Sequence, residues 1–268
     1  MFYVKLFSQK KLPITLIFLV FLMLNGCFHP CFFSIRGDGN IIEEYRAVGP
    51  FTSVISRGAF DVIITKGHSG QIQLVGDKNL LNHISTYVTA DQTLIIESRR
   101  TLNPSRDIKI FVQMEIIEKL TIEGSGEMRC KDRFEGHSLG LWILGSGSIN
   151  FNYIKADEVK NKIAGSGDII LNADCSRIVN NIICSGDITL VGNSDTLVLD
   201  ICASGNLKAF DFISKECEIN ILGSGDARVY ITDLLNVNIA GSGNVYYKGN
   251  PLRINSNITG SGKLIQVD

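Results

Sequence analysis

Acidic and amide side chains recur at one fixed place in a repeated glycine-rich motif. Gly-Ser-Gly, or a close variant, begins at eight positions, and most of the residues that follow it are Asp or Asn. In chain order these residues are Glu127, Ser148, Asp168, Asp187, Asn206, Asp226, Asn244 and Lys263. Glycine-rich Asp corners can share calcium ions where they recur every nine residues. Here the spacing is 18 to 21 residues, and Ser148 and Lys263 interrupt the acids, so the pattern favours a hydrogen-bonded corner ladder over a calcium site.

A second polar column suggests glycan chemistry. Its members each stand three residues before a motif: Thr121, Trp142, Lys162, Asn181, Asp200, Asn220, Asn238 and Asn257. Glycoside hydrolysis needs two carboxyl groups that flank the scissile bond. This column offers Asp200 alone, among amides, so it indicates hydrogen bonding. Glycan binding without catalysis is one alternative, with Trp142, Tyr153 or Tyr246 stacking on sugars; a polysaccharide lyase or hydrolase is another.

The side chains that support nucleophilic or metal chemistry are scattered along the chain. The four histidines accompany no Gly-x-Ser-x-Gly motif, and the cysteines after residue 100 show no Cys-x-x-Cys spacing. We therefore expect no catalytic residue, no metal site and no cofactor. The sequence predicts a protein that is not an enzyme.

The first 26 residues predict a signal peptide. A basic head with three lysines precedes an apolar run from Ile14 to Leu24, which is too short to span a bilayer but suits a secretory signal. The run leads into Leu24-Asn25-Gly26-Cys27, which resembles the lipobox of bacterial lipoproteins. That resemblance implies cleavage before Cys27 and acylation of its thiol. A plain signal peptide and a retained anchor are the alternatives to lipidation of Cys27.

Charge restricts the partners. The 268 residues are 45% hydrophobic with a formal net charge of −1, which is typical of a globular chain and offers no basic surface for nucleic acid. Without residues 1–26, 23 basic and 27 acidic residues remain. Acyl chains on Cys27, rather than charge, would then provide membrane attachment. Phe28 follows Cys27, and by resemblance to Gram-negative lipoproteins the lack of Asp there favours the outer over the inner membrane.

The repeat also predicts the elements that position these side chains. Isoleucine stands two residues before every motif, at Ile122, Ile143, Ile163, Ile182, Ile201, Ile221, Ile239 and Ile258. A polar residue precedes most of these isoleucines, and such alternation indicates half-buried strands. Units of about 19 residues that return the same residue type to the same place predict an all-β protein, a parallel β-helix or β-solenoid. The isoleucines would form one internal stack.

The same patterns divide the chain into four segments. Residues 1–26 are the lipoprotein signal peptide and residues 27–46 a tether. Residues 47–123 form an irregular N-terminal part of the β-helix that covers its end, with one short helix between Asp77 and Ile84. Residues 124–268 form the regular Gly-Ser-Gly repeat β-helix.

One stretch is similar to a known family. Phe51 through Val75, which includes Arg57-Gly58-Ala59-Phe60-Asp61-Val62, is followed by repeated Gly-Ser-Gly-Asp/Asn corners. This combination resembles the bacterial DUF2807 family, described as an auto-transporter adhesin head, or GIN, domain. The resemblance covers roughly residues 50–266 and implies a right-handed parallel β-helix. It provides no catalytic residues to transfer.

We therefore expect a lipid-anchored protein of the bacterial cell envelope that acts as a non-catalytic binding, adhesion or scaffold module. A repeated outer face suits extended partners such as a glycan or another envelope protein. No capping helix follows the last coil, and unpaired strand edges there predict homo-oligomers. A purely structural periplasmic protein is the remaining alternative.

Overall fold

The structure is a computed structural model that describes residues 34–268. Residues 1–33, including the predicted signal peptide and Cys27, lie outside the described residues. In chain order the elements are β1 (Ile35–Arg36), β2 (Ile41–Ala47), β3 (Ser53–Arg57), β4 (Asp61–Lys66), β5 (Gln71–Asp77), α2 (Lys78–Leu81), β6 (Ile84–Val88), β7 (Thr93–Ser98), β8 (Leu102–Asn103), β9 (Lys109–Met114), β10 (Lys119–Ile122), β11 (Glu127–Ile143), β12 (Ser148–Ile163), β13 (Asp168–Ile182), β14 (Asp187–Ile201), β15 (Asn206–Gly223), β16 (Ala227–Gly241), β17 (Asn244–Lys248), β18 (Arg253–Gly260) and β19 (Lys263–Gln266). No helix among them is long and apolar enough to cross a membrane.

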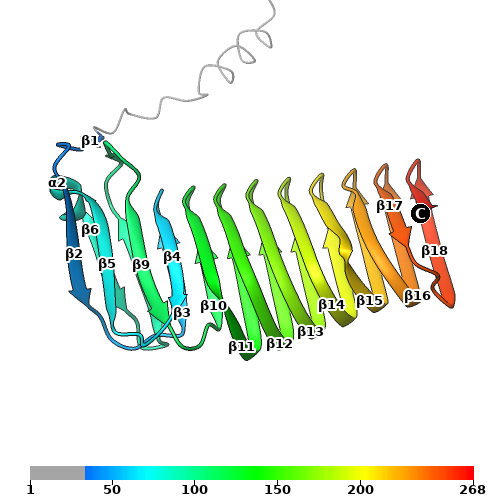
Figure 1. The fold of residues 1–268 in the computed structure, drawn as a ribbon. Coiled ribbons are helices and arrows are strands. Elements are labelled where there is room, and N and C mark those ends of the chain that lie inside the picture. Colours follow the sequence, from blue (N-terminus) through cyan, green and yellow to red (C-terminus); the bar gives the residue numbers. More distant parts are fainter. Residues whose placement is uncertain (1–33) are drawn as a thin grey trace, which may run out of the picture. The chain divides into compact units, whose positions relative to one another are not determined.

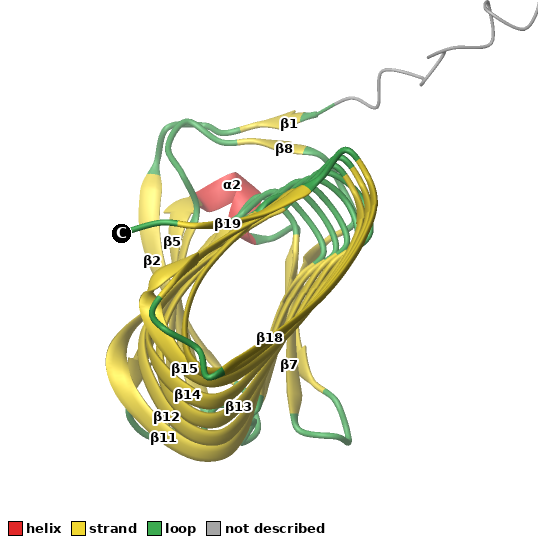
Figure 2. Ribbon diagram, turned by 90° about the vertical axis from the view of Figure 1, so that its right-hand side faces the viewer, coloured by secondary structure: helices red, strands yellow, loops and turns green. Residues whose placement is uncertain are grey.

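The regular part is a stack of parallel coils, which confirms the predicted β-solenoid. Each strand from β11 to β16 starts beside a glycine corner, runs down one wall in the view of Figure 1, bends at the lower edge and returns up the other wall (Figures 1 and 2). Adjacent coils pair in parallel, with motif position against motif position: Ile143 pairs with Ile163, and Ile163 with Ile182. The repeat therefore sets the register, because one coil of sequence advances the chain by one strand spacing, about 4.8 Å.

The predicted isoleucine stack forms the axis of the core. From Ile122 to Ile239 every member is at most 2% exposed. Ile258, in the final coil, still pairs with Ile239 but is 37% exposed. Burial of each isoleucine therefore depends on a coil on both sides, and the C-terminal coil has only one neighbour.

The glycine corners owe their composition chiefly to close packing between coils. A Cβ atom added to Gly167 would lie 1.9 Å from the carbonyl oxygen of Gly147 in the coil before, and 2.9 Å from the Cγ2 of Ile143. The φ of Gly167 is not in the left-handed region, so conformational freedom is not the reason for glycine at this position. The motif's last glycine is present in all eight coils, whereas the first is replaced by Cys184 and Ala203.

The N-terminal part is an irregular start to the same solenoid, and it covers the end of the stack. β3 and β4 form a coil that pairs on one side with β10 and β11. On its other side lie β7 and β9, which come earlier in the chain than β10. Beyond them β5 pairs antiparallel with both β9 and β2, and β6 pairs antiparallel with β7. The buried Leu80 and Leu81 of α2 fill the end of the core. The short helix predicted between Asp77 and Ile84 is confirmed as α2.

The predicted tether of residues 27–46 is wrong in its second half. Residues 41–47 form β2, which pairs antiparallel with β5 along its whole length. Two residues of β1 also pair with β8. Residues of the predicted tether thus belong to the sheets. The sequence did not reveal this, because the partner strands lie at least 24 residues further along the chain.

Asp77, at the end of β5, is a fully buried carboxylate that holds this end together. Its oxygens accept hydrogen bonds from the backbone N–H of Gly39 at 2.7 Å and from the hydroxyl and N–H of Ser105 at 2.7 and 2.9 Å. Burial alone would raise the pKa of Asp77, but these hydrogen bonds outweigh burial and hold the pKa below its ordinary value. The carboxylate therefore fastens the turn after β1 to the loop before β9.

The C-terminal end is uncovered. Every residue of β18 is exposed, and its edge pairs with no strand beyond it among the described residues. The expectation that copies of the chain associate through such an end stays a prediction.

We predict that Gly167→Ala lowers the free energy of unfolding by about 3 kcal/mol, because the new methyl group must push two coils apart. Urea denaturation followed by circular dichroism measures the loss. Gly136→Ala is the matched control, since nothing lies within 4 Å of a Cβ atom at that glycine. Equal stability of the two variants would contradict the packing explanation.

We predict that Asp77→Asn costs about 2 kcal/mol at pH 7, because charged acceptors make the stronger hydrogen bonds. A lowered folded-state pKa contributes stability above the unfolded pKa of about 3.9, and this contribution is lost as the pH falls through the folded pKa. Wild type should therefore lose more stability than Asp77→Asn below about pH 4. The exposed Asp211→Asn serves as control in urea titrations at each pH. Parallel pH profiles for wild type and Asp77→Asn would rule the explanation out.

Candidate functional site

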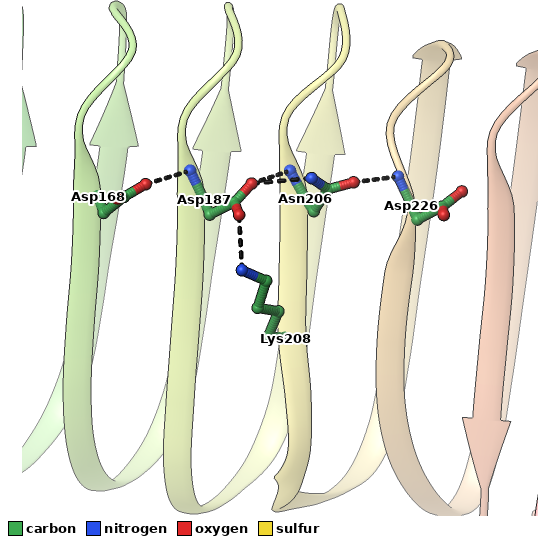
Figure 3. Close-up of polar contacts among 5 residues, drawn as sticks. All are labelled: Asp168, Asp187, Asn206, Lys208 and Asp226. Atoms are coloured by element: carbon green, nitrogen blue, oxygen red, sulfur yellow. Dashed lines mark hydrogen bonds and ion pairs between the residues drawn. The ribbon is translucent and has the colours of Figure 1, made fainter. Parts of the chain in front are cut away.

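The acidic column at the corners is a hydrogen-bond ladder (Figure 3). Oδ1 of Asp168 accepts the backbone N–H of Asp187 at 3.0 Å, one coil on. Oδ1 of Asp187 accepts the N–H and the amide of Asn206 at 3.2 and 2.8 Å, and Oδ1 of Asn206 accepts the N–H of Asp226 at 3.0 Å. These side chains thus substitute for backbone acceptors between coils.

Asp187 also binds Lys208, whose Nζ lies 2.7 Å from its second oxygen. Partial burial would raise the pKa of Asp187, but the hydrogen bonds from Lys208 and Asn206 lower it overall. Within residues 34–268 no cluster of three or more His, Cys, Asp or Glu side chains is arranged to hold a metal ion. The geometry is that of the predicted corner ladder.

The second polar column is also a ladder. The amide of Asn220 donates to Asp200 at 3.0 Å, and the amide of Asn238 donates to Asn220 at 2.9 Å. Beside this column runs a shallow groove of about 260 Å³ whose other side is apolar, with Leu222 and Ala240 among its lining residues. We call it the amide groove.

A larger groove lies at the opposite edge, where the strands β11 to β14 bend between the two walls. Its volume is about 570 Å³. We call it the polar groove and define it by its lining residues, Glu135, Gly136, His137, Lys155, Ala156, Asp157, Asp174, Cys175, Ser176, Asn193 and Asp195. Small side chains in adjacent coils form its floor, because Gly136 aligns with Ala156 and Ala156 with Cys175. A groove across four coils offers donors and acceptors at regular intervals.

Three of the four carboxylates of the polar groove have partners. Asp157 lies 2.8 Å from His137, and Asp195 lies 2.8 Å from Lys215. Asp174 accepts hydrogen bonds from Tyr153 and Asn193, both at 2.5 Å. The bond to Asp174, together with burial, raises the pKa of the Tyr153 hydroxyl.

Sequence reasoning did not find the polar groove. Asp157, Ser176 and Asp195 do recur at the coil spacing, which was the available signal. The hollow itself depends on small side chains such as Ala156 and Cys175, and these look like ordinary core residues in the sequence. Only the bend of the strands brings the polar columns to either side of that floor.

The three aromatic residues considered for sugar stacking are in contact with cations. Lys119 and Lys162 lie 4.6 and 5.8 Å from the ring centre of Trp142. Arg133 covers the ring of Tyr153 at 3.7 Å, and Arg228 approaches that of Tyr246 at 5.4 Å. Their faces are engaged in cation–π contacts, which favours local packing over sugar stacking.

The cysteines among the described residues are all free. Burial raises the pKa of Cys130 and of Cys175 to about 12, and it raises that of Cys217 as well. Buried thiols of this kind stay protonated at neutral pH and make poor nucleophiles. Cys184 and Cys202 are exposed. The predicted lipidation site, Cys27, lies outside the described residues.

Solved structures share this fold. A protein of Parabacteroides distasonis titled a "putative lipid binding protein" is 27% identical, with a TM-score of 0.81 over 88% of this chain and 100% of its own. A "putative adhesin" of the same species is 20% identical, with a TM-score of 0.79 over 87% of this chain and 100% of that one. A "putative adhesin" of Parabacteroides merdae is 18% identical, with a TM-score of 0.79 over 88% and 99% of the two chains.

No match to a curated protein was found. A family model with the description "Putative auto-transporter adhesin, head GIN domain" matches residues 50–251. That description suggests an adhesin-like protein of the cell surface or envelope, and the similar structures show that the fold is shared. Because the match covers most of the sequence, the chain belongs to the DUF2807 family, which carries that description.

Proposed function

We propose that this protein is a lipid-anchored module of the bacterial outer membrane that binds an extended polar ligand, such as an envelope glycan, without turning it over. Acyl chains on Cys27 hold it at the membrane. The rigid solenoid presents the polar groove, and the ligand lies along the stack across several coils.

The observation that carries the proposal is the polar groove itself. Its lining combines four carboxylates, an imidazole, an ammonium group, a hydroxyl and one amide above a floor of small side chains. Across β11 to β14 these groups repeat at about 4.8 Å, so the groove spans about 14 Å. A polymer with hydroxyl groups at regular intervals can satisfy such a surface without any single deep pocket.

The chemistry of the groove supports binding more than catalysis. Asp157, Asp174 and Asp195 each bond a neighbouring side chain. Cys175 is the thiol in the groove, and its raised pKa keeps it protonated. These groups are therefore suited to fixed hydrogen bonds with a ligand.

A polysaccharide-active enzyme is the second candidate, because the same groove gathers four carboxyl groups. They are Glu135, Asp157, Asp174 and Asp195. Lyases and hydrolases use acidic residues that flank the bond to be cleaved. The release of shortened or unsaturated sugars from a bound polymer would favour this candidate.

We predict that Asp157→Ala with Asp195→Ala weakens binding of an envelope polysaccharide about thirtyfold, since each of the two lost hydrogen bonds contributes about 1 kcal/mol. Both side chains are more than half exposed, so the fold should persist. Ligands found on a glycan array are measured by titration calorimetry, with the exposed Asp211→Ala as control. Unchanged affinity in the double variant would remove the polar groove from the proposal.

We predict that the wild-type chain fractionates with outer membranes and that Cys27→Ser appears in the soluble fraction, because acyl chains are the proposed anchor. Protease treatment of intact cells then locates the body. Digestion on whole cells supports adhesion at the surface, whereas protection together with membrane attachment indicates a periplasmic scaffold. Membrane attachment of Cys27→Ser would contradict the anchor.

A further inference from the structure

One column of outward side chains is apolar through six consecutive coils. Its members directly follow the buried isoleucines, and we call them the apolar ridge: Leu144, Ala164, Ile183, Cys202, Leu222 and Ala240. Leu144, Ile183 and Leu222 are 42%, 44% and 62% exposed. Single exposed leucines are common on protein surfaces, but here the coil register aligns them over about 24 Å. Contiguous exposed apolar surface of this kind marks a contact site.

Polar groups bound the apolar ridge at both ends. In the N-terminal coils the same column holds Glu97, Arg57 and Glu123, with Arg57 bound to Glu123 at 2.6 Å and to Glu97 at 3.2 Å. In the last coil the column ends in Thr259, which pairs with Ala240. The six coils between carry no charge in this column, so the apolar character is confined to the middle of the solenoid.

The apolar ridge lies at the same edge as β1, the first strand of the described residues. β1 pairs with β8, which belongs to the connection between β7 and β9. That connection corresponds to the corner at Gly58, on which the Gly124 corner stacks. β1 and the glycine corners therefore share one edge of the molecule, the upper edge in Figure 1. The polar groove occupies the other edge, at the bends.

The length of chain before β1 restricts how far this edge can stand from the membrane. Seven residues separate Cys27 from Ile35, and they reach at most about 25 Å even when fully extended. The column of isoleucines from Ile122 to Ile258 is longer, about 34 Å by strand spacing. A chain acylated at Cys27 therefore keeps β1, at the N-terminal end of the corner edge, within about 25 Å of the lipid surface.

The surroundings of the ridge suit the interface between lipid and water. Trp142 stands in the neighbouring column beside Leu144, between the ammonium groups of Lys119 and Lys162. Tryptophan and lysine are typical of the headgroup level, where an apolar body and a polar group can both be satisfied. Exposed corner serines such as Ser146 and Ser185 add hydroxyl groups along the same edge.

We propose that the apolar ridge rests on the lipid bilayer, so that the solenoid lies lengthwise on the membrane and turns the polar groove away from it. This proposal rests on the proposed anchor at Cys27. The acyl chains supply attachment, and the ridge supplies orientation.

Trp142 is the chain's only tryptophan, so its fluorescence reports on this edge. The full-length acylated protein is reconstituted into phosphatidylcholine vesicles, part of whose lipid carries bromine near the top of the acyl chains. We expect bromine to quench Trp142 by about half. Leu144→Asp with Leu222→Asp should float with the vesicles as wild type does, yet lose most of the quenching. Ile170→Asp, at a 48% exposed apolar residue on the other wall, should behave as wild type.

The two readouts separate the ridge from the anchor. Flotation of wild type together with quenching that the double variant loses supports the proposal. If the wild type floats but Trp142 is not quenched, or is quenched equally in wild type and double variant, the apolar ridge does not contact the bilayer. The proposed lipid anchor at Cys27 is unaffected by that result. Failure of the wild type to float, with no more attachment than Cys27→Ser, overturns the anchor and the ridge with it. Circular dichroism confirms that each variant keeps its strands.

Discussion

The structure depends on one constraint: each coil hydrogen-bonds to the next through parallel backbone ladders in strict register. Like positions then stand about 4.8 Å apart, which is closer than most side chains tolerate at a sharp corner. Glycine at Gly147 and Gly167 follows from that spacing, because a carbonyl oxygen of the previous coil occupies the place of a Cβ atom. The isoleucine stack and the Asx ladder of Asp187 and Asn206 follow from the same register.

This constraint also explains how far the sequence could predict the fold. In the regular coils the partner of any residue lies one repeat away, so a column read from the sequence is a column in space. The buried stack and the corner ladder were predictable for that reason. The positions of the corner glycines were predictable, but the reason for them was not. At Gly167 glycine is needed because the neighbouring coil approaches closely, and this contact cannot be inferred from the sequence of one coil.

The parts that were not predictable depend on distant or collective features. The strand at residues 41–47 was expected to be tether, because its partner β5 gives no signal in the strand's own sequence. The polar groove requires the bend of four strands and a floor of small residues such as Ala156, neither of which has a repeating motif. The pairing of β3 with β10 joins residues 66 positions apart and leaves no periodic trace.

The coil formed by β3 and β4 lies between two layers that come later in the chain, β7 with β9 on one side and β10 with β11 on the other. This position restricts the order in which the long-range strand pairs can form. The second face of that coil is paired only when Lys119 is in place, so the chain closes a loop of 66 residues between Ser53 and Lys119. Every later coil closes only about one repeat, as the bond from Asp187 to Asp168 across 19 residues illustrates. After that first step the solenoid grows by short, local additions in the direction of synthesis, which is a low contact-order route for an otherwise all-β chain. We accordingly expect fraying to begin at β18 and β19, which have a single neighbouring coil among the described residues.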